Sequence, residues 1–351
     1  MATNREIENQ VAEHRQRWMA PMWALIQEVV QEEGVDATPL QEMLAYQWES
    51  GGKRIRALLP LMVAEALGEE PGRLLGFGAA CELIHNATLV HDDLQDGDRW
   101  RRGEPTVWAH YGEARAINLG DAMLYLAPLC LGRVEAGEET LWRVGQQMNR
   151  YVLQVIAGQE REFALGLDGA NWTDYEAMVR GKTSGLMALP VVGAARLCGM
   201  EGPVLETLGR MAGQLGVLFQ IQDDILDLYG EKGRDKVGGD IREGKISALV
   251  VQYWEGRQPG EEADRLRACL EAPREETSAE DVAWARELFV REGALQGSLE
   301  AIDACLSRVQ LLGQELEGEA PKLLALMEGL GAIFLRPIAD VIDTFGDGES
   351  S

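Results

Sequence analysis

Two short acidic motifs carry the residues best suited to chemistry: HDDLQD at residues 91–96 and QDDILD at residues 222–227. Each motif follows an apolar run that predicts a helix, and a helix turns by about 100° per residue. The first and third aspartates of each motif then lie within about 40° of one another and form a carboxylate pair on one face. The six aspartates are Asp92, Asp93 and Asp96 in the first motif and Asp223, Asp224 and Asp227 in the second.

Paired carboxylates on a helix need a compensating cation. Like charges one turn apart destabilise a helix by a few tenths of a kcal/mol, and their burial costs far more. Ligands that are all oxygen favour a hard cation, and Mg²⁺ commonly binds through one or two carboxylates plus substrate phosphates. The repeated motif therefore predicts two acidic walls that hold one diphosphate through Mg²⁺; the alternative is a pair of solvated helix ends with acidic caps.

Composition limits the class of protein. The chain has 351 residues, of which 46% are hydrophobic, and no Ser/Gly-rich linker divides it, so we expect one domain over residues 1–351. The net charge of -25 argues against a nucleic-acid partner or an anionic membrane surface. Basic residues nevertheless cluster near the acidic motifs, at Lys53, Arg54 and Arg56, at Arg99, Arg101 and Arg102, and at Lys236, Arg242 and Lys245.

The cysteines and the N-terminus indicate a cellular compartment. The five cysteines are widely spaced and odd in number, which predicts neither a disulfide framework nor a zinc site but a reducing environment. The first ten residues are polar and lack the apolar core of a signal peptide, and no run of about 18 apolar residues predicts a transmembrane helix. We expect a cytoplasmic protein.

Apolar residues recur at helical spacing through most of the chain, and no strand alternation exceeds four residues. The sequence therefore predicts an all-α fold. Residues 1–38 form an N-terminal helical segment in this interpretation, and residues 347–351 form a frayed tail. Further helices are predicted near residues 56–67, 73–91, 114–131, 139–166, 172–200 and 204–229, with three to five more after residue 246.

Several residues outside the acidic motifs are placed to assist them. Gly51 and Gly52 allow the backbone to approach a ligand closely just before Lys53. His85 precedes Asp92 by seven residues, or two helical turns, and so shares its face. We expect His85 to belong to the site, although an isolated histidine is more often a core residue.

Other candidates lie in the second half of the chain. Gly181, inside a predicted helix, favours a kink that would direct Lys182 and Thr183 inward. Gln220 lies one turn before Asp224. Residues 230–244, rich in glycine and charge, are interpreted as a flap that carries Lys236 and leads to Lys245.

Together these motifs resemble those of the polyprenyl synthetase family, the trans-isoprenyl diphosphate synthases. The resemblance covers roughly residues 51–245 and implies a bundle of about a dozen helices around a deep central cavity, assembled as a homodimer. It also implies head-to-tail condensation of isopentenyl diphosphate with an allylic diphosphate (dimethylallyl, geranyl or farnesyl), with two or three Mg²⁺ ions per site. The motifs are GGKRIR (51–56), LIHNATLVHDDLQD (83–96), RRGEPT (101–106), GKTSG (181–185), FQIQDDILD (219–227) and GDIREGK (239–245).

The same resemblance implies a role for each candidate. Asp92, Asp96 and Asp223 would bind Mg²⁺, and all six aspartates together with Lys182 would be catalytic. The flap departs from the family pattern, because the usual lysine position is occupied by Asp235, with Lys236 one residue later. The allylic substrate would contact Arg101, Lys182, Thr183, Gln220, Lys236 and Lys245, and isopentenyl diphosphate would contact Lys53, Arg56, His85 and Arg102.

Product length follows from side-chain size beside the first motif. The growing chain should run along the first aspartate helix, where one five-carbon unit spans about one turn, roughly 5 Å. Ala87 and Thr88, one turn before Asp92, are small, whereas short-product enzymes tend to carry an aromatic residue there. Ile84 lies deeper and is also modest in size. We expect geranylgeranyl diphosphate, with a longer polyprenyl product as the alternative.

Two other functions are possible for a chain of this kind. A class I terpene cyclase also uses an aspartate-rich motif, but it does not need the residues assigned to isopentenyl diphosphate. A non-catalytic synthase subunit typically loses aspartates from one motif, whereas all six are present here. The sequence therefore favours a catalytic prenyltransferase.

Overall fold

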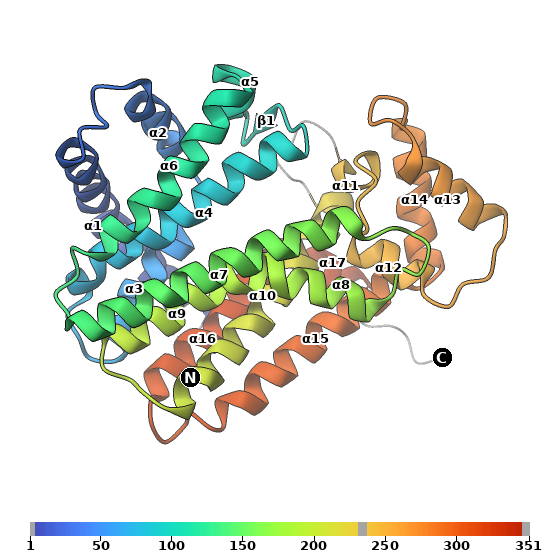
Figure 1. The fold of residues 1–351 in the computed structure, drawn as a ribbon. Helices are drawn as coiled ribbons and strands as arrows, with labels where there is room; N and C mark the ends of the chain where they lie inside the picture. The colour runs from blue at the N-terminus through green and yellow to red at the C-terminus, as the bar shows by residue number, and fades with distance from the viewer. Residues whose placement is uncertain (1–3, 231–236, 346–351) are drawn as a thin grey trace. The chain divides into compact units, whose positions relative to one another are not determined.

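The computed structural model describes residues 4–230 and 237–345, which are helical almost throughout (Figure 1). The all-α prediction is confirmed. The described residues form two compact units: unit 1 within residues 1–153, 186–212 and 312–330, and unit 2 within residues 154–185, 213–311 and 331–351. The single domain and its central cavity stay predictions.

Unit 1 is built around α4 (Leu75–Gln95), the helix that ends in the first acidic motif. Helix α4 packs against α1 (Asn4–Glu32), α3 (Ile55–Ala66) and α6 (Glu113–Leu131). Its side chains Phe77, Leu83 and Ile84 are almost completely buried, so the helix is held rigidly up to the motif. The unit also contains α2 (Pro39–Glu49), η1 (Pro71–Leu74), α5 (Val107–Tyr111), most of α9 (Gly185–Leu197), and parts of α7 (Glu138–Ala164), α10 (Pro203–Tyr229) and α16 (Pro321–Leu335).

The segment after the first acidic motif is more regular than the sequence predicts. Strands β1 (Trp100–Arg101) and β2 (Glu104–Pro105) form a small antiparallel hairpin in which Arg101 pairs with Glu104. The two turn residues, Arg102 (φ 56°) and Gly103 (φ 85°), are both left-handed, as a two-residue type I′ turn requires. A two-residue strand leaves no periodicity to detect, which is why the sequence predicts no strand here.

Unit 2 contains the C-terminal part of α10 and, with it, the second acidic motif. The predicted helix over residues 172–200 is interrupted: α8 (Trp172–Val179) continues into one turn of π-helix, η2 (Arg180–Ser184), before α9. The kink predicted at Gly181 therefore takes the form of a π-turn.

The C-terminal part of the chain holds more helices than expected. After residue 246 the described residues form six α-helices instead of three to five, because α12 and α17 have only 7 residues each and are too short to give a periodic pattern. The remaining elements of unit 2 are α11 (Gly239–Arg242), α12 (Ala248–Trp254), α13 (Glu261–Glu271), α14 (Ala279–Arg291), most of α15 (Ala294–Gly313), η3 (Arg336–Ile338) and α17 (Ala339–Phe345).

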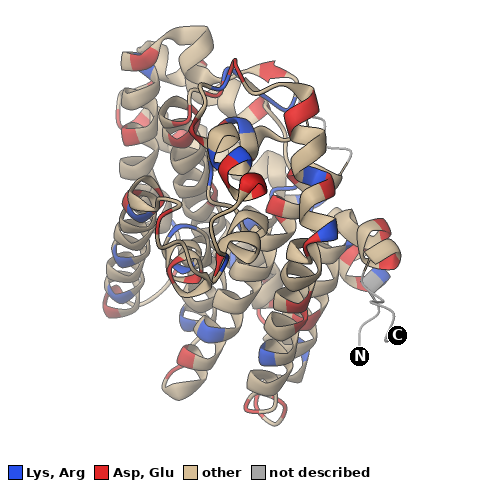
Figure 2. Cartoon of the chain, turned by 90° about the vertical axis from the view of Figure 1, so that its right-hand side faces the viewer, with Lys and Arg blue, Asp and Glu red and all other residues tan. Residues whose placement is uncertain are grey.

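Charge is spread over the helices instead of being confined to one segment. Acidic and basic positions alternate along many of them (Figure 2), so the net charge of -25 does not come from a single acidic tail. Among the described residues no helix is both long enough and apolar enough to cross a bilayer.

Candidate active site

The first acidic motif occupies the last turn of α4, and its three aspartates have different surroundings. Asp92 and Asp96 are partly exposed, whereas Asp93 is only 2% exposed. The Asp93 carboxylate accepts a hydrogen bond from Arg101 Nε at 2.6 Å and lies 2.5 Å from Arg101 Nη2. Burial raises the pKa of Asp93 to about 6, although the Arg101 charge opposes that shift. The motif thus presents two carboxylates at its surface and uses the third to hold the β1–β2 hairpin.

The glycine-rich loop between α2 and α3 approaches this hairpin. Arg102 Nη1 donates to the Gly51 carbonyl at 2.5 Å, and a Cβ on Gly52 would lie 2.6 Å from the same nitrogen. Gly52 also has a φ of 111°, which side chains rarely adopt. The group that lies close to the Gly51–Gly52 backbone is therefore the Arg102 side chain. As a result, the candidate residues Lys53 and Arg102 lie in neighbouring loops.

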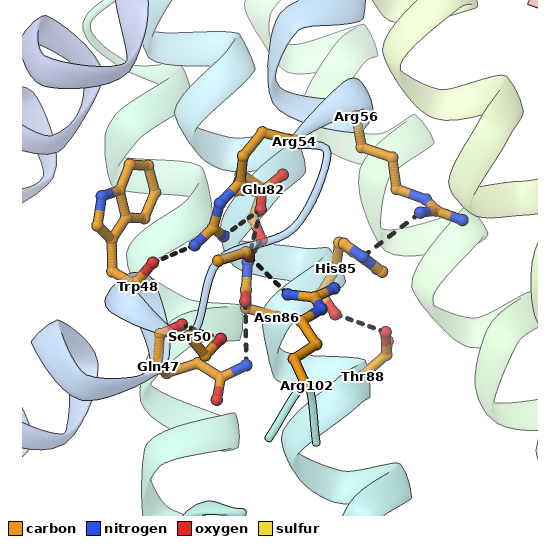
Figure 3. Close-up of polar contacts among 11 residues, drawn as sticks. Gln47, Trp48, Ser50, Arg54, Arg56, Glu82, His85, Asn86, Thr88 and Arg102 are labelled. Carbon is orange, nitrogen blue, oxygen red and sulfur yellow. Dashed lines mark hydrogen bonds and ion pairs between the residues drawn. The ribbon is translucent and has the colours of Figure 1, made fainter. Parts of the chain in front are cut away.

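Arg56 and His85 form the second part of this cationic group (Figure 3). Arg56 Nη1 lies 3.4 Å from His85 Nε2. Burial, reinforced by the charges of Arg56, Arg102, Arg101 and Arg54, holds the pKa of His85 well below its usual value, so the imidazole is neutral. A guanidinium can only donate, so Nε2 is the acceptor and Nδ1 carries the hydrogen. That Nδ1 is buried and has no hydrogen-bond partner among the described residues.

The second acidic motif lies at the C-terminal end of α10, and its central residue is Asp224. One Asp224 oxygen accepts from Tyr175 Oη and from the Ala248 backbone N–H, both at 2.7 Å, and the other accepts from Gln220 Nε2 at 2.9 Å. Burial raises the pKa of Asp224 to about 6, whereas these hydrogen bonds lower it. Asp224 therefore fixes α8, α10 and the start of α12 to one another.

The π-turn places the next two candidates beside this network. Thr183 is buried and donates to Gln220 Oε1 at 3.0 Å. Lys182 Nζ lies 2.5 Å from Glu162 Oε2 of α7. A Cβ on Gly181 would lie 2.8 Å from Gly158 Cα, so two glycines let the π-turn contact α7 directly. The turn thus brings Lys182 and Thr183 to one end of α7 and α10.

The end of the predicted flap is tied to the second motif. Asp227, 2% exposed, accepts the Asp240 backbone N–H at 3.0 Å, and its carbonyl accepts the Gly238 N–H at 2.9 Å. Lys245 donates its backbone N–H to the Asp240 carbonyl at 2.9 Å, and its Nζ lies 2.9 Å from Glu243. Lys236 lies outside the described residues.

The residues assigned to product length lie on α4, before the first motif. Ala87 and Ile84 are buried, at 0% and 2% exposure, and Thr88 donates its hydroxyl to the His85 carbonyl at 2.8 Å. Helix α6 packs along α4 and buries Met123, whereas Tyr125 is 79% exposed and points away from this core. Of these two α6 residues, Met123 is therefore the one that could limit a chain growing along α4.

Sequence reasoning assigned no role to five residues that hold the candidates in place: Arg54, Glu82, Asn86, Glu162 and Tyr175. Glu82 did leave a signal, because a single acid inside the apolar run before the first motif needs a buried partner. Tyr175 left none, since its partner Asp224 is 49 residues away in the chain.

Comparisons with known proteins identify the family to which this chain is similar. The polyprenyl synthetase family model matches residues 37–289. A short chain isoprenyl diphosphate synthase of Methanothermobacter thermautotrophicus is 33% identical over 290 residues, which cover 79% of this chain and 85% of that protein. A geranylgeranyl diphosphate synthase of Mycobacterium tuberculosis is 34% identical over 234 residues, 66% of each chain.

Solved structures point the same way. The crystal structure of a geranylgeranyl pyrophosphate synthetase from Pyrococcus horikoshii matches with a TM-score of 0.78 and 26% identity, over 93% of this chain and 98% of that one. The prediction of a trans-prenyltransferase is confirmed by the family match together with these relatives. The chain belongs to the polyprenyl synthetase family.

Proposed function

We propose that this protein condenses isopentenyl diphosphate head-to-tail with an allylic diphosphate and that its main product is geranylgeranyl diphosphate. The observation that carries the proposal is the pair of aspartate motifs, each at the end of a well-packed helix and each beside fixed cationic side chains. The relatives named for geranylgeranyl synthesis and the small residues along α4 support the product length.

The proposed metal ligands are Asp92, Asp96 and Asp223, all partly exposed in the structure. Among the described residues no three His, Cys, Asp or Glu side chains form a ready-made metal site. Magnesium would bind through one or two of the proposed carboxylates and complete its shell with water and substrate phosphates. When bound, Mg²⁺ would neutralise the negative charge that develops on the diphosphate leaving group.

The cationic and polar side chains supply the rest of the chemistry in this proposal. Ionisation of the allylic carbon–oxygen bond leaves negative charge on diphosphate oxygens, which Arg101, Lys182 and Lys245 stabilise, with Thr183 and Gln220 as hydrogen-bond partners. The double bond of isopentenyl diphosphate then attacks the allylic carbocation to form the new carbon–carbon bond. A proton is lost to the departing diphosphate, which restores the double bond.

Isopentenyl diphosphate would bind to Lys53, Arg56, His85 and Arg102. Burial lowers the pKa of Arg56 only to about 10, so its guanidinium stays charged near neutral pH. The His85 ring, 3.4 Å from Arg56 Nη1, would join the subsite as a neutral side chain. A neutral donor beside charged arginines can contact a diphosphate without adding to the repulsion between the cations.

The test is incubation of the protein with labelled isopentenyl diphosphate, Mg²⁺ and each allylic starter, followed by chromatography of the dephosphorylated alcohols. We expect geranylgeraniol as the main alcohol. Longer alcohols or farnesol would overturn the assignment of product length, and no condensation with any starter would overturn the reaction. As a check on the geometric argument, Ala87→Phe should shorten the products, whereas Tyr125→Phe, on the exposed face of α6, should leave them unchanged.

We also propose that the protein forms a homodimer through one face of α6 and α7. Ile117, Tyr125 and Leu129 of α6 are 46%, 79% and 40% exposed, and Trp142 and Leu153 of α7 are 67% and 64% exposed. Large apolar side chains gathered on the exposed faces of two helices indicate a protein interface. Light scattering should give twice the mass of the chain, and Tyr125→Glu should lower it toward the monomer; a monomeric wild type would contradict this.

A cytoplasmic location is proposed from the cysteines. All five are unpaired, and Cys81, Cys130, Cys269 and Cys305 are buried. Reduced buried thiols are typical of a reducing compartment. Thiol titration of the denatured protein from its native source should give five reactive groups, and fewer would contradict the proposal.

A further inference from the structure

Arg54 lies in the chain between Lys53 and Arg56, two of the residues assigned to isopentenyl diphosphate, but its side chain turns away from that of Arg56 (Figure 3). It is 8% exposed, and Nη1 lies 2.5 Å from Glu82 Oε1. Its other terminal nitrogen donates to the Trp48 carbonyl, and the guanidinium lies 4.8 Å from the centre of the Trp48 ring. The Arg54 side chain is thus held by three separate contacts within the protein.

Glu82 is the anion at the centre of this network, and it is 2% exposed. Besides Arg54, its Oε1 accepts from Asn86 Nδ2 at 2.9 Å. Asn86 is oriented in turn by Gln47 of α2, whose Nε2 donates to Asn86 Oδ1 at 3.1 Å. The network therefore joins α2, the loop before α3 and the middle of α4, and each link is a buried hydrogen bond that is costly to break.

The backbone around Arg54 depends on this network. Arg54 has a φ of 55°, a left-handed conformation that costs free energy for a residue with a side chain. The fixed side chain stabilises that conformation at the point where the loop enters α3, and its carbonyl accepts the Leu58 N–H at 3.1 Å. The direction in which Lys53 and Arg56 leave the loop follows from it.

Glu82 also supports the charge of the neighbouring cations. Burial lowers the pKa of Arg56, and the Glu82 carboxylate raises it again. For Arg102, burial and the charges of Arg101 and Arg54 lower the pKa, while Glu82 and Asp93 raise it. Several buried guanidinium groups would repel one another without such a counter-charge.

We propose that Glu82 is a positioning residue for isopentenyl diphosphate: its buried carboxylate anchors Arg54, and Arg54 fixes the loop so that Lys53, Arg56 and His85 are held ready for a diphosphate. Neither Glu82 nor Arg54 touches the substrate. The inference rests on the proposed function, because it assigns a role within the subsite named there.

The direction of the change in the KM for isopentenyl diphosphate distinguishes a positioning role from direct electrostatic repulsion. A carboxylate near a diphosphate weakens its binding by repulsion, so removal of the charge alone would lower the KM for isopentenyl diphosphate. Loss of a positioning contact has the opposite result, because a misplaced loop no longer presents its cations in the required geometry.

The variant Glu82→Gln makes this test sharp. Glu82 Oε2 has no hydrogen-bond partner among the described residues, so a glutamine can place its amide nitrogen there and keep its oxygen on Arg54 and Asn86. The substitution thus removes the charge and keeps the hydrogen bonds, whereas Glu82→Met removes both. We expect Glu82→Met to raise the KM for isopentenyl diphosphate about tenfold and to change the KM for the allylic substrate less than about twofold, while Glu82→Gln raises neither KM by more than about twofold.

A second pair of variants shows whether Glu82 acts through Arg54. Arg54→Met and the double variant Arg54→Met/Glu82→Met should raise the KM for isopentenyl diphosphate no further than Glu82→Met does, since all of them break the same link. The double variant also replaces a buried ion pair with apolar side chains, which is often neutral for folding, so it keeps the test available if Glu82→Met does not fold.

The control is Leu83→Ala, which removes a buried side chain of α4 next to Glu82 in the chain but outside the network. It should lower the melting temperature and leave the ratio of the two KM values unchanged. An unchanged or lower KM for isopentenyl diphosphate in Glu82→Met, a rise in Glu82→Gln as large as that in Glu82→Met, additive effects in the double variant, or the same shift in Leu83→Ala would each overturn the inference. If the wild type showed no condensation, the proposed function would fail instead.

Discussion

The two aspartate motifs have identical spacing, yet the structure surrounds them differently. In the first, Asp92 and Asp96 are partly exposed and only Asp93 is buried. In the second, only Asp223 is partly exposed, while Asp224 and Asp227 are 4% and 2% exposed. Three carboxylates therefore lie at the surface of their units. The other three, of Asp93, Asp224 and Asp227, are buried and form hydrogen bonds with neighbouring segments.

The buried aspartates Asp93 and Asp224 also differ in their hydrogen-bond partners. Asp93 pairs with the charged Arg101, itself a proposed ligand, and so ties the hairpin to α4. Asp224 has the neutral donors Tyr175, Gln220 and the Ala248 N–H. A motif with one spacing can therefore serve two purposes, and the surroundings of each residue decide which. On this basis we propose that the partly exposed carboxylates bind metal and that the buried ones position neighbouring segments.

The largest expected effect separates exposed from buried residues. Asp92→Asn and Asp223→Asn should each lower kcat by a factor on the order of 10²–10³, because the leaving group loses electrostatic stabilisation, and should barely change the melting temperature. Steady-state kinetics and thermal unfolding measure the two quantities. Full activity in either variant would break the comparison.

The third aspartates of the two motifs, Asp96 and Asp227, should show the next largest difference, which is a difference in stability. Asp227→Ala should lower the free energy of unfolding by about 2–3 kcal/mol, because it leaves the Asp240 N–H without the acceptor that the buried Asp227 carboxylate provides. Asp96→Ala, the matched change at a partly exposed residue, should reduce activity without that loss of stability. Urea unfolding of both variants decides between them, and equal losses of stability would show that the two positions are equivalent.

Tyr175→Phe tests the network around Asp224. It removes the hydrogen bond from Tyr175 Oη to Asp224 and should lower the free energy of unfolding by about 1.5 kcal/mol. Because Gln220 and Thr183 are held through the same carboxylate, the KM for the allylic substrate should rise several-fold while that for isopentenyl diphosphate stays constant. A change confined to isopentenyl diphosphate would contradict this chain of contacts.

The smallest effect concerns pH. The folded-state pKa of His85 lies well below its value of about 6.5 in the unfolded chain, so below that pH the unfolded state binds a proton that the folded state does not. The His85 contribution to stability should therefore fall as pH drops from about 6.5 to 5, whereas the raised pKa values of Asp93 and Asp224, both about 6, act in the opposite direction. His85→Gln removes the His85 contribution, so its stability relative to the wild type should increase as pH falls over that range; an unchanged pH dependence in urea unfolding would exclude a contribution from His85.

Long helices could be predicted closely from the sequence. The ends of α6, α7 and α10 lie within two residues of the predicted ranges, because their apolar periodicity extends over many turns. Gly181 also predicted a break, since a glycine inside a helix weakens it. The π-turn itself could not be predicted, because it depends on contact between Gly158 and Gly181 of separate elements.

The roles within each motif could not be predicted from spacing. Asp93 and Asp224 look the same as their neighbours in the sequence, and their burial depends on residues brought from other elements: Arg101, Tyr175 and Ala248. Glu82 is intermediate, because its charge in an apolar helix signalled a partner without identifying Arg54. Residue type and spacing predicted which residues matter, whereas tertiary contacts determine what each one does.

The most direct test of this account is a crystal structure with Mn²⁺ in place of Mg²⁺ and an unreactive allylic thiolodiphosphate, with the metal located by its anomalous signal. The account predicts that carboxylate oxygens of Asp92, Asp96 and Asp223 ligate the metal ions on one diphosphate, while Asp93 stays on Arg101 and Asp224 on Tyr175. Metal bound to Asp93 or Asp224, or a diphosphate that contacts only one of the two motifs, would contradict it.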